Sequence, residues 1–85
     1  MYSELPNTGC NPIDFDELVD SSTPLDKVKE ICSFDINCFE FYRNSDSDYF
    51  KCEPDSKHAK DARMTLYIKG KNLLFEISIA KDILY

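Results

Sequence analysis

The 85-residue sequence contains no tryptophan, one histidine, two glycines and four prolines. A single histidine provides few groups that titrate near neutral pH, which argues against an elaborate enzyme. Few glycines and prolines, together with 42% apolar and 13% aromatic residues, are typical of a folded domain and exclude a disordered acidic tail. No apolar run approaches the roughly 20 residues that span a bilayer, so we expect no membrane insertion.

Positive charge is also scarce, because ten Lys and Arg face sixteen Asp and Glu, a formal net charge of −6. Nucleic acids and anionic membranes attract basic surfaces, so we expect neither as a partner. Residues 1–56 carry four basic and thirteen acidic side chains (net −9), whereas residues 57–85 carry six and three (net +3). The two halves either attract each other in the folded chain or form head-to-tail contacts between copies.

Four cysteines, Cys10, Cys32, Cys38 and Cys52, stand in a chain too short to bury a large core. Their even number predicts two disulfides, which form in oxidising compartments. A zinc site that also uses His58 is the alternative, but the chain has no Cys-x-x-Cys pair. We therefore expect disulfides, no metal and no cofactor.

The chain begins at Met1 without the basic and apolar regions of a signal peptide. We expect a secreted protein whose leader was removed, with Met1 not native, or a protein that reaches an oxidising site by another route, such as a virus particle.

The clearest helix signal is at Thr23, the expected N-cap, followed by Pro24 at the first helical position and Asp26 in the first turn. Apolar residues at steps of three and four then predict a helix that runs to about Cys32. A further helical turn is expected at residues 14–19. The apolar stripe consists of Leu25, Val28, Ile31 and Cys32.

The pattern then changes to the two-residue period of strands. Residues 38–43 and 49–53 predict an aromatic hairpin around a turn at residues 44–48, with Phe41 and Phe50 in the core. The fold class is therefore α+β, with one helix packed on a small antiparallel sheet and stapled by disulfides.

The rest of the chain continues the two-residue pattern after a polar connection. We expect that connection at residues 54–63, a strand at residues 64–68, a tight turn at residues 70–72 and a final strand at residues 73–79.

Five parts of the chain together form a recognisable pattern: Tyr2 with Asn7–Cys10, Leu25–Cys32, Asp35–Phe41, Tyr49–Cys52 and Thr65–Lys69. This pattern resembles the PAN/apple family, which has a helix ending in cysteine, an Asp-Asn-Cys segment with an aromatic strand, a hairpin to a further cysteine and a closing Leu-Tyr-x-Lys strand. The resemblance covers about residues 2–69 of a single domain, 1–85, and leaves residues 70–85 as an extra C-terminal strand or tail.

The chain departs from the family at Val28, where the family usually has a second helical cysteine. The resemblance therefore implies a Cys32–Cys38 bridge and leaves Cys52 for Cys10. It also implies a non-catalytic module that binds protein or carbohydrate in an extracellular setting.

An aromatic and polar patch on the predicted hairpin is our first candidate for ligand binding. Tyr42 and Tyr49 are expected to remain partly exposed beside Glu40 and Arg43, unless the N-terminal segment or the tail covers that sheet face.

Two further positions carry polar side chains. Asn44, Asp46 and Asp48 alternate like calcium ligands, but Tyr49 and Asp55 stand where the calcium loop needs glycine and glutamate, so we predict a solvated turn. We expect His58 to be a surface residue.

The tail is the second candidate surface, with an alternating apolar row of Leu73, Phe75, Ile77 and Ile79. We expect this row to pack either as an extra strand within the domain or against another chain, and the second case includes self-association through the C-terminal strand.

No phosphate loop or Ser/His/Asp set is present, so we expect no enzyme. The expected function is a recognition module for protein or carbohydrate on an extracellular or particle surface. The alternative is a small structural subunit of a virion or extracellular filament.

Overall fold

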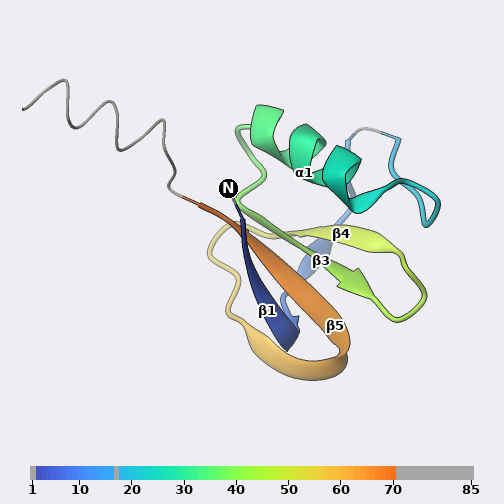
Figure 1. Ribbon diagram of the computed structural model, residues 1–85. Coiled ribbons are helices and arrows are strands. Elements are labelled where there is room, and N and C mark those ends of the chain that lie inside the picture. The colour runs from blue at the N-terminus through green and yellow to red at the C-terminus, as the bar shows by residue number, and fades with distance from the viewer. Residues whose placement is uncertain (1, 17, 71–85) are drawn as a thin grey trace, which may run out of the picture.

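The computed structural model describes residues 2–16 and 18–70. One helix lies against a five-stranded sheet of order β1-β5-β3-β4-β2, in which all neighbouring strands are antiparallel (Figure 1). Two disulfides join these elements. The predicted α+β class with disulfides is confirmed, although the sheet has more strands than the sequence indicated. The elements are β1 (Tyr2–Gly9), β2 (Pro12–Ile13), α1 (Leu25–Phe34), β3 (Glu40–Asn44), β4 (Tyr49–Cys52) and β5 (Ala59–Lys69).

α1 begins directly after Pro24, whose carbonyl accepts a hydrogen bond from the N–H of Val28 at 3.1 Å. The expectation that Thr23 caps the helix is wrong, because Pro24 holds the N-cap position and the Thr23 hydroxyl accepts instead from the N–H of Asp20 at 3.0 Å. The helix continues to Phe34, two residues beyond the predicted end. The turn expected at residues 14–19 is not helical where the structure describes it.

The face of the sheet that α1 covers holds the main apolar core. Phe41 is fully buried at its centre, with its ring stacked 5.1 Å from the ring of Tyr67 and edge-on at 5.7 Å from Tyr2. Val28 and Cys32 of the predicted helical stripe are also fully buried against this core. Val28, Cys32 and Phe41 therefore pack as the sequence predicted, whereas Ile31 of the stripe lines an open groove.

The opposite face of the sheet has a smaller core. β4 and β5 lie on either side of β3 and both run antiparallel to it, so they are parallel to each other. The segment between Cys52 and Ala59 must therefore pass across β3 and return to the opposite end of the sheet. His58 in this crossover lies 2.9 Å from Glu40, which points to the face opposite Phe41. On this face Tyr42 is 4% exposed and Leu66 is fully buried. Phe50, the second predicted core residue, is half-buried here.

β5 has a neighbour on both of its sides. Residues 65–69 pair with β1, from Tyr2↔Lys69 to Pro6↔Thr65, and residues 64–68 pair with β3. Both edges of this part of β5 are therefore occupied. The final strand expected at residues 73–79 lies outside the described residues.

The sequence did not predict β1, β2 or the first half of β5. Residues 59–63 were expected in a polar connection, but they extend β5, where Thr8 and Gly9 of β1 pair with Lys60 and Ala59. β1 contains Pro6 and an irregularity between Pro6 and Thr8, both of which weaken a strand signal.

Candidate functional site

The predicted patch on the β3–β4 hairpin is not formed. Tyr42 and Tyr49 are only 4% and 6% exposed, and they point to opposite faces of the sheet. The Tyr49 hydroxyl donates a hydrogen bond to the carbonyl of Thr23 at 3.0 Å, and burial raises the pKa of both tyrosines. Arg43 lies 4.9 Å above the Tyr49 ring, whereas Glu40 contacts His58 on the other face. The expectation that Tyr42 and Tyr49 remain partly exposed is therefore wrong, because each ring packs into a core cluster on its own face of the sheet.

The cysteines form Cys10–Cys52 and Cys32–Cys38, the two pairs that the family resemblance implies. Because all four sulfurs are oxidised, the alternative zinc site would have no thiolate ligand. In the described part of the chain, no group of three His, Cys, Asp or Glu side chains is arranged to hold a metal ion.

The 44–48 segment is a hairpin turn, as predicted. The Asn44 side-chain oxygen accepts hydrogen bonds from the N–H groups of Asp46 and Asp48 at 2.9 and 3.0 Å. Asn44 therefore organises the turn through its own backbone neighbours, the usual role of asparagine in such positions.

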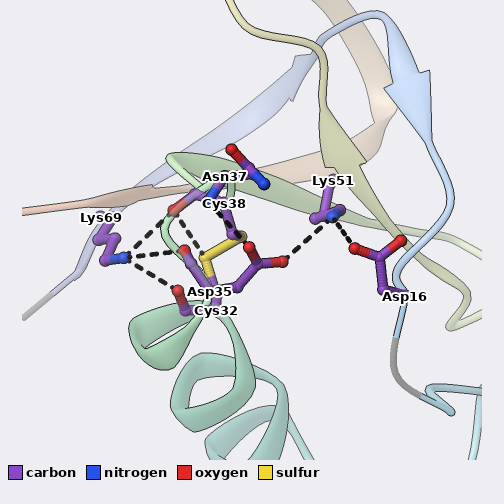
Figure 2. Close-up of polar contacts among 7 residues, drawn as sticks. All are labelled: Asp16, Cys32, Asp35, Asn37, Cys38, Lys51 and Lys69. Atoms are coloured by element: carbon purple, nitrogen blue, oxygen red, sulfur yellow. Dashed lines mark hydrogen bonds and ion pairs between the residues drawn. A yellow bond between two sulfur atoms is a disulfide. The ribbon is translucent and has the colours of Figure 1, made fainter.

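The most distinctive polar structure lies at the C-terminal end of α1 (Figure 2). The Cys32–Cys38 disulfide, with Cα atoms 5.2 Å apart, closes a loop of five intervening residues. Within it, the N–H of Cys38 donates to the Asp35 carbonyl at 3.0 Å, and the N–H of Asn37 donates to the Asp35 carboxylate at 2.8 Å. The disulfide and these internal bonds fix the shape of the loop.

Lys69, at the end of β5, binds the backbone carbonyls at the C-terminal end of α1. Its ammonium donates to the carbonyls of Cys32, Cys38 and Asp35 at 3.0, 3.3 and 3.4 Å (Figure 2). The last carbonyls of a helix lack partners within the helix and carry partial negative charge, so a cation here is favourable. Lys69 therefore anchors the loop to the sheet.

Lys51 holds the loop from the other side. Its side chain is 3% exposed and its ammonium lies 3.1 Å from Asp35 and 3.5 Å from Asp16. The N–H of Asn37 and the ammonium of Lys51 stabilise the charged carboxylate against the opposing effect of burial, and they lower the pKa of Asp35. The Asp35 carboxylate is thus held by the N–H of Asn37 and by the ammonium of Lys51.

The residues on either side of Asp35 face solvent instead. Phe34 is 84% exposed, Ile36 is 83% exposed and Phe39 is 55% exposed. We call these three residues the apolar tip. Single exposed apolar residues are common on proteins, but three within six positions, two of them in the disulfide-closed loop, are suited to contact with another apolar group.

Two open grooves border the apolar tip. The first, of about 420 Å³, is lined by Ile31 and Phe34 together with charged side chains. The second, of about 480 Å³, lies between Phe39 and the turn after β4, and its charged lining residues are all acidic: Glu40, Glu53 and Asp55. The surroundings of Phe39 therefore favour a ligand that is apolar and carries positive charge.

The sequence analysis missed the apolar tip. The signal was present, because a loop of five residues between two bonded cysteines is too short to fold back over its own apolar side chains. Phe34 and Ile36 lie within that loop, on both sides of Asp35. The other predicted interface, Leu73, Phe75, Ile77 and Ile79, lies outside the described residues.

Comparisons of the chain with known protein families, with curated proteins and with solved structures find no match. Within residues 2–16 and 18–70, no helix is long and apolar enough to cross a membrane. The two disulfides indicate an oxidising environment.

Proposed function

We propose that this chain is a non-catalytic, disulfide-stabilised recognition module of the PAN/apple type that binds protein on an extracellular or particle surface. The observation that carries this proposal is the exposure of Phe34 and Ile36 in the disulfide-closed loop and of Phe39 directly after it. A loop held by a disulfide and two lysines loses little conformational entropy when it binds. Contacts of a few apolar side chains can then give measurable affinity, because the loop is already ordered before it binds.

The same side chains favour a protein ligand over a glycan. Sugar hydroxyls are recognised through hydrogen-bond donors and acceptors, and the side chains of the apolar tip provide neither. Apolar and aromatic anchors at the centre of a contact are typical of protein interfaces.

The experiment is a parallel screen of the oxidised full chain against a displayed peptide library and a glycan array. We expect peptide ligands whose binding is lost in a Phe34→Ser/Ile36→Ser variant. The matched control is Leu18→Ser, because Leu18 is 91% exposed but lies outside the apolar tip. Ligands that bind the double variant as well as the wild type, or hits confined to glycans, would show that the proposal is wrong.

A structural subunit of a virion or filament is the second candidate. It is favoured by the charge asymmetry of the chain, since residues 1–56 and 57–85 carry net charges of −9 and +3. Among the ion pairs of the described residues, His58–Glu40 joins the two halves, whereas the others lie within one half. The exposed charges of opposite sign therefore remain available for contacts between copies.

A further inference from the structure

We propose that the groove between Phe39 and the turn after β4 receives an arginine side chain of a protein ligand. We call it the acidic groove, because its charged lining residues are Glu40, Glu53 and Asp55. The inference rests on the proposed function and deepens it, since it names the residue type that the partner presents beside the apolar tip.

The turn that forms one wall of the acidic groove is fixed before any ligand binds. It directly follows Cys52, which is bonded to Cys10. The N–H of Glu53 donates to the carbonyl of Asn11 at 2.9 Å, and the N–H of Asn11 donates to the Ser56 hydroxyl at 2.8 Å. A ligand therefore meets carboxylates carried by a backbone that is already ordered, which keeps the entropic cost of binding low.

Phe39 forms the other wall and offers an aromatic surface. Its side chain is 55% exposed, and its carbonyl accepts a hydrogen bond from the N–H of Lys69 at 2.9 Å, which holds the backbone in place. The face of an aromatic ring attracts cations. The protein makes such a contact elsewhere, because Arg43 lies 4.9 Å above the ring of Tyr49.

The carboxylates of the acidic groove are available to a cation. Among the ion pairs of residues 2–16 and 18–70, Glu40 contacts His58, whereas the exposed side chains of Glu53 and Asp55 take part in none. No lysine or arginine of these described residues lines the groove. Its negative charge therefore attracts a cationic ligand, and the net charge of −6 of the whole chain acts in the same direction.

Arginine fits this combination of groups better than lysine does. The guanidinium is planar, so it can stack on an aromatic ring and still donate two parallel hydrogen bonds to a carboxylate. A lysine ammonium is a strongly hydrated point charge without this planar fork. A metal ion is not favoured, because no group of three His, Cys, Asp or Glu side chains in the described part of the chain is arranged to hold one.

The test is an NMR titration of the isotope-labelled, oxidised full chain with two synthetic peptides. One is acetyl-Leu-Arg-Leu-amide, and the other carries citrulline, the uncharged analogue of arginine, in the same position. We expect the arginine peptide to shift the amide signals of Phe39, Glu53 and Asp55. The citrulline peptide should bind roughly tenfold more weakly, because it loses the ion pairs and the cation–ring contact.

A matched pair of variants tests whether the carboxylates of the groove are responsible. Glu53→Gln/Asp55→Asn removes two of them, and asparagine tolerates the positive φ of 65° at position 55. Asp46→Asn/Asp48→Asn removes two exposed carboxylates from the β3–β4 turn instead. We expect the first variant to bind the arginine peptide several-fold more weakly and the second to bind it as the wild type does. Both variants change the net charge equally, so a loss confined to the first comes from the groove.

Four results would overturn the proposal: equal affinity for the two peptides, equal affinity of Glu53→Gln/Asp55→Asn and wild type, equal losses in the two variants, or no shift of the groove signals at millimolar peptide. The library screen separates these failures from a failure of the proposed function. Ligands that depend on Phe34 and Ile36 but bind Glu53→Gln/Asp55→Asn as well as the wild type would overturn the arginine assignment and leave the proposed function standing. A groove that binds the arginine peptide while the screen yields no ligand dependent on Phe34 and Ile36 would show the reverse.

Discussion

Lys51 is the charged residue that the fold buries among residues 2–16 and 18–70. Its side chain is 3% exposed, and of its two carboxylate partners Asp35 is 20% exposed whereas Asp16 is 82% exposed. A buried ammonium needs a partner that is itself shielded from water, because an exposed carboxylate attracts it only weakly. Asp35 is therefore the partner that contributes most to the stability of the buried Lys51 side chain.

We expect Asp35→Asn to lower the free energy of unfolding by about 1–3 kcal/mol near neutral pH, because Lys51 then loses its shielded counter-charge. The matched control is Asp16→Asn, which removes the exposed partner and should cost less than about 1 kcal/mol. Urea denaturation of the oxidised proteins measures both values. Equal losses of unfolding free energy in Asp35→Asn and Asp16→Asn would contradict the assignment of Asp35 as the main partner of Lys51.

The same pair has a pH dependence with a definite sign. The pKa of Asp35 is lowered below its ordinary value of 3.8 in the folded protein. Its stabilising effect is therefore fully present above the unfolded pKa and is lost as pH falls through the folded pKa. The difference in unfolding free energy between wild type and Asp35→Asn should shrink between about pH 6 and about pH 2. A constant difference over that range would contradict this expectation.

At the scale of elements, the two disulfides have different roles. Cys10–Cys52 joins residues 42 positions apart and links the N-terminal region to β4, whereas Cys32–Cys38 joins residues 6 positions apart at the end of α1. The entropy of the unfolded chain that a disulfide removes grows with the length of the closed loop. The long bridge should therefore stabilise the domain, and the short one should chiefly shape the apolar tip.

We expect the Cys10→Ala/Cys52→Ala variant to lose about 4 kcal/mol of unfolding free energy and the Cys32→Ala/Cys38→Ala variant about 2–3 kcal/mol. Because Cys32 and Cys38 are fully buried, their replacement also costs packing energy, which reduces the difference between the two stability losses without removing it. In the library screen, the Cys32→Ala/Cys38→Ala variant should bind less tightly while it still folds. The reverse order of stability, or unchanged binding, would contradict the division of roles.

Local patterns predicted some elements and missed others for physical reasons. α1 and the β3–β4 hairpin carry their own signals, which are the apolar stripe with Val28 and the turn organised by Asn44. β1 has no such signal, because Pro6 interrupts it and its residues are mostly exposed. It becomes a strand because the edge of β5 offers it hydrogen-bond partners, which is a tertiary effect.

The candidate site was missed for a related reason. Alternation assigns Tyr42 and Tyr49 to opposite faces of the hairpin, but it does not reveal that each ring packs into a separate core cluster. The exposure of Phe34 and Ile36 follows from the short closed loop, so it depended on knowing that Cys32 pairs with Cys38. Covalent connectivity, which local sequence patterns do not specify, decides where the surface lies.

At the scale of the whole molecule, the net charge of −6 makes copies repel one another at low salt. Head-to-tail association would have to overcome this repulsion through the basic residues of the second half, of which Lys60 is exposed on β5. A recognition module of this charge should be monomeric, whereas a structural subunit should associate.

We expect the full chain to sediment as a monomer in low salt, because the net charge of −6 makes copies repel one another when it is unscreened. Sedimentation velocity over a range of protein concentrations measures the assembly state. Lys60→Glu and Lys27→Glu make the same charge change in the basic and the acidic half, so they form a matched pair. Low-salt oligomers that dissociate in high salt, and that are lost in Lys60→Glu but retained in Lys27→Glu, would contradict the monomer and favour the structural subunit.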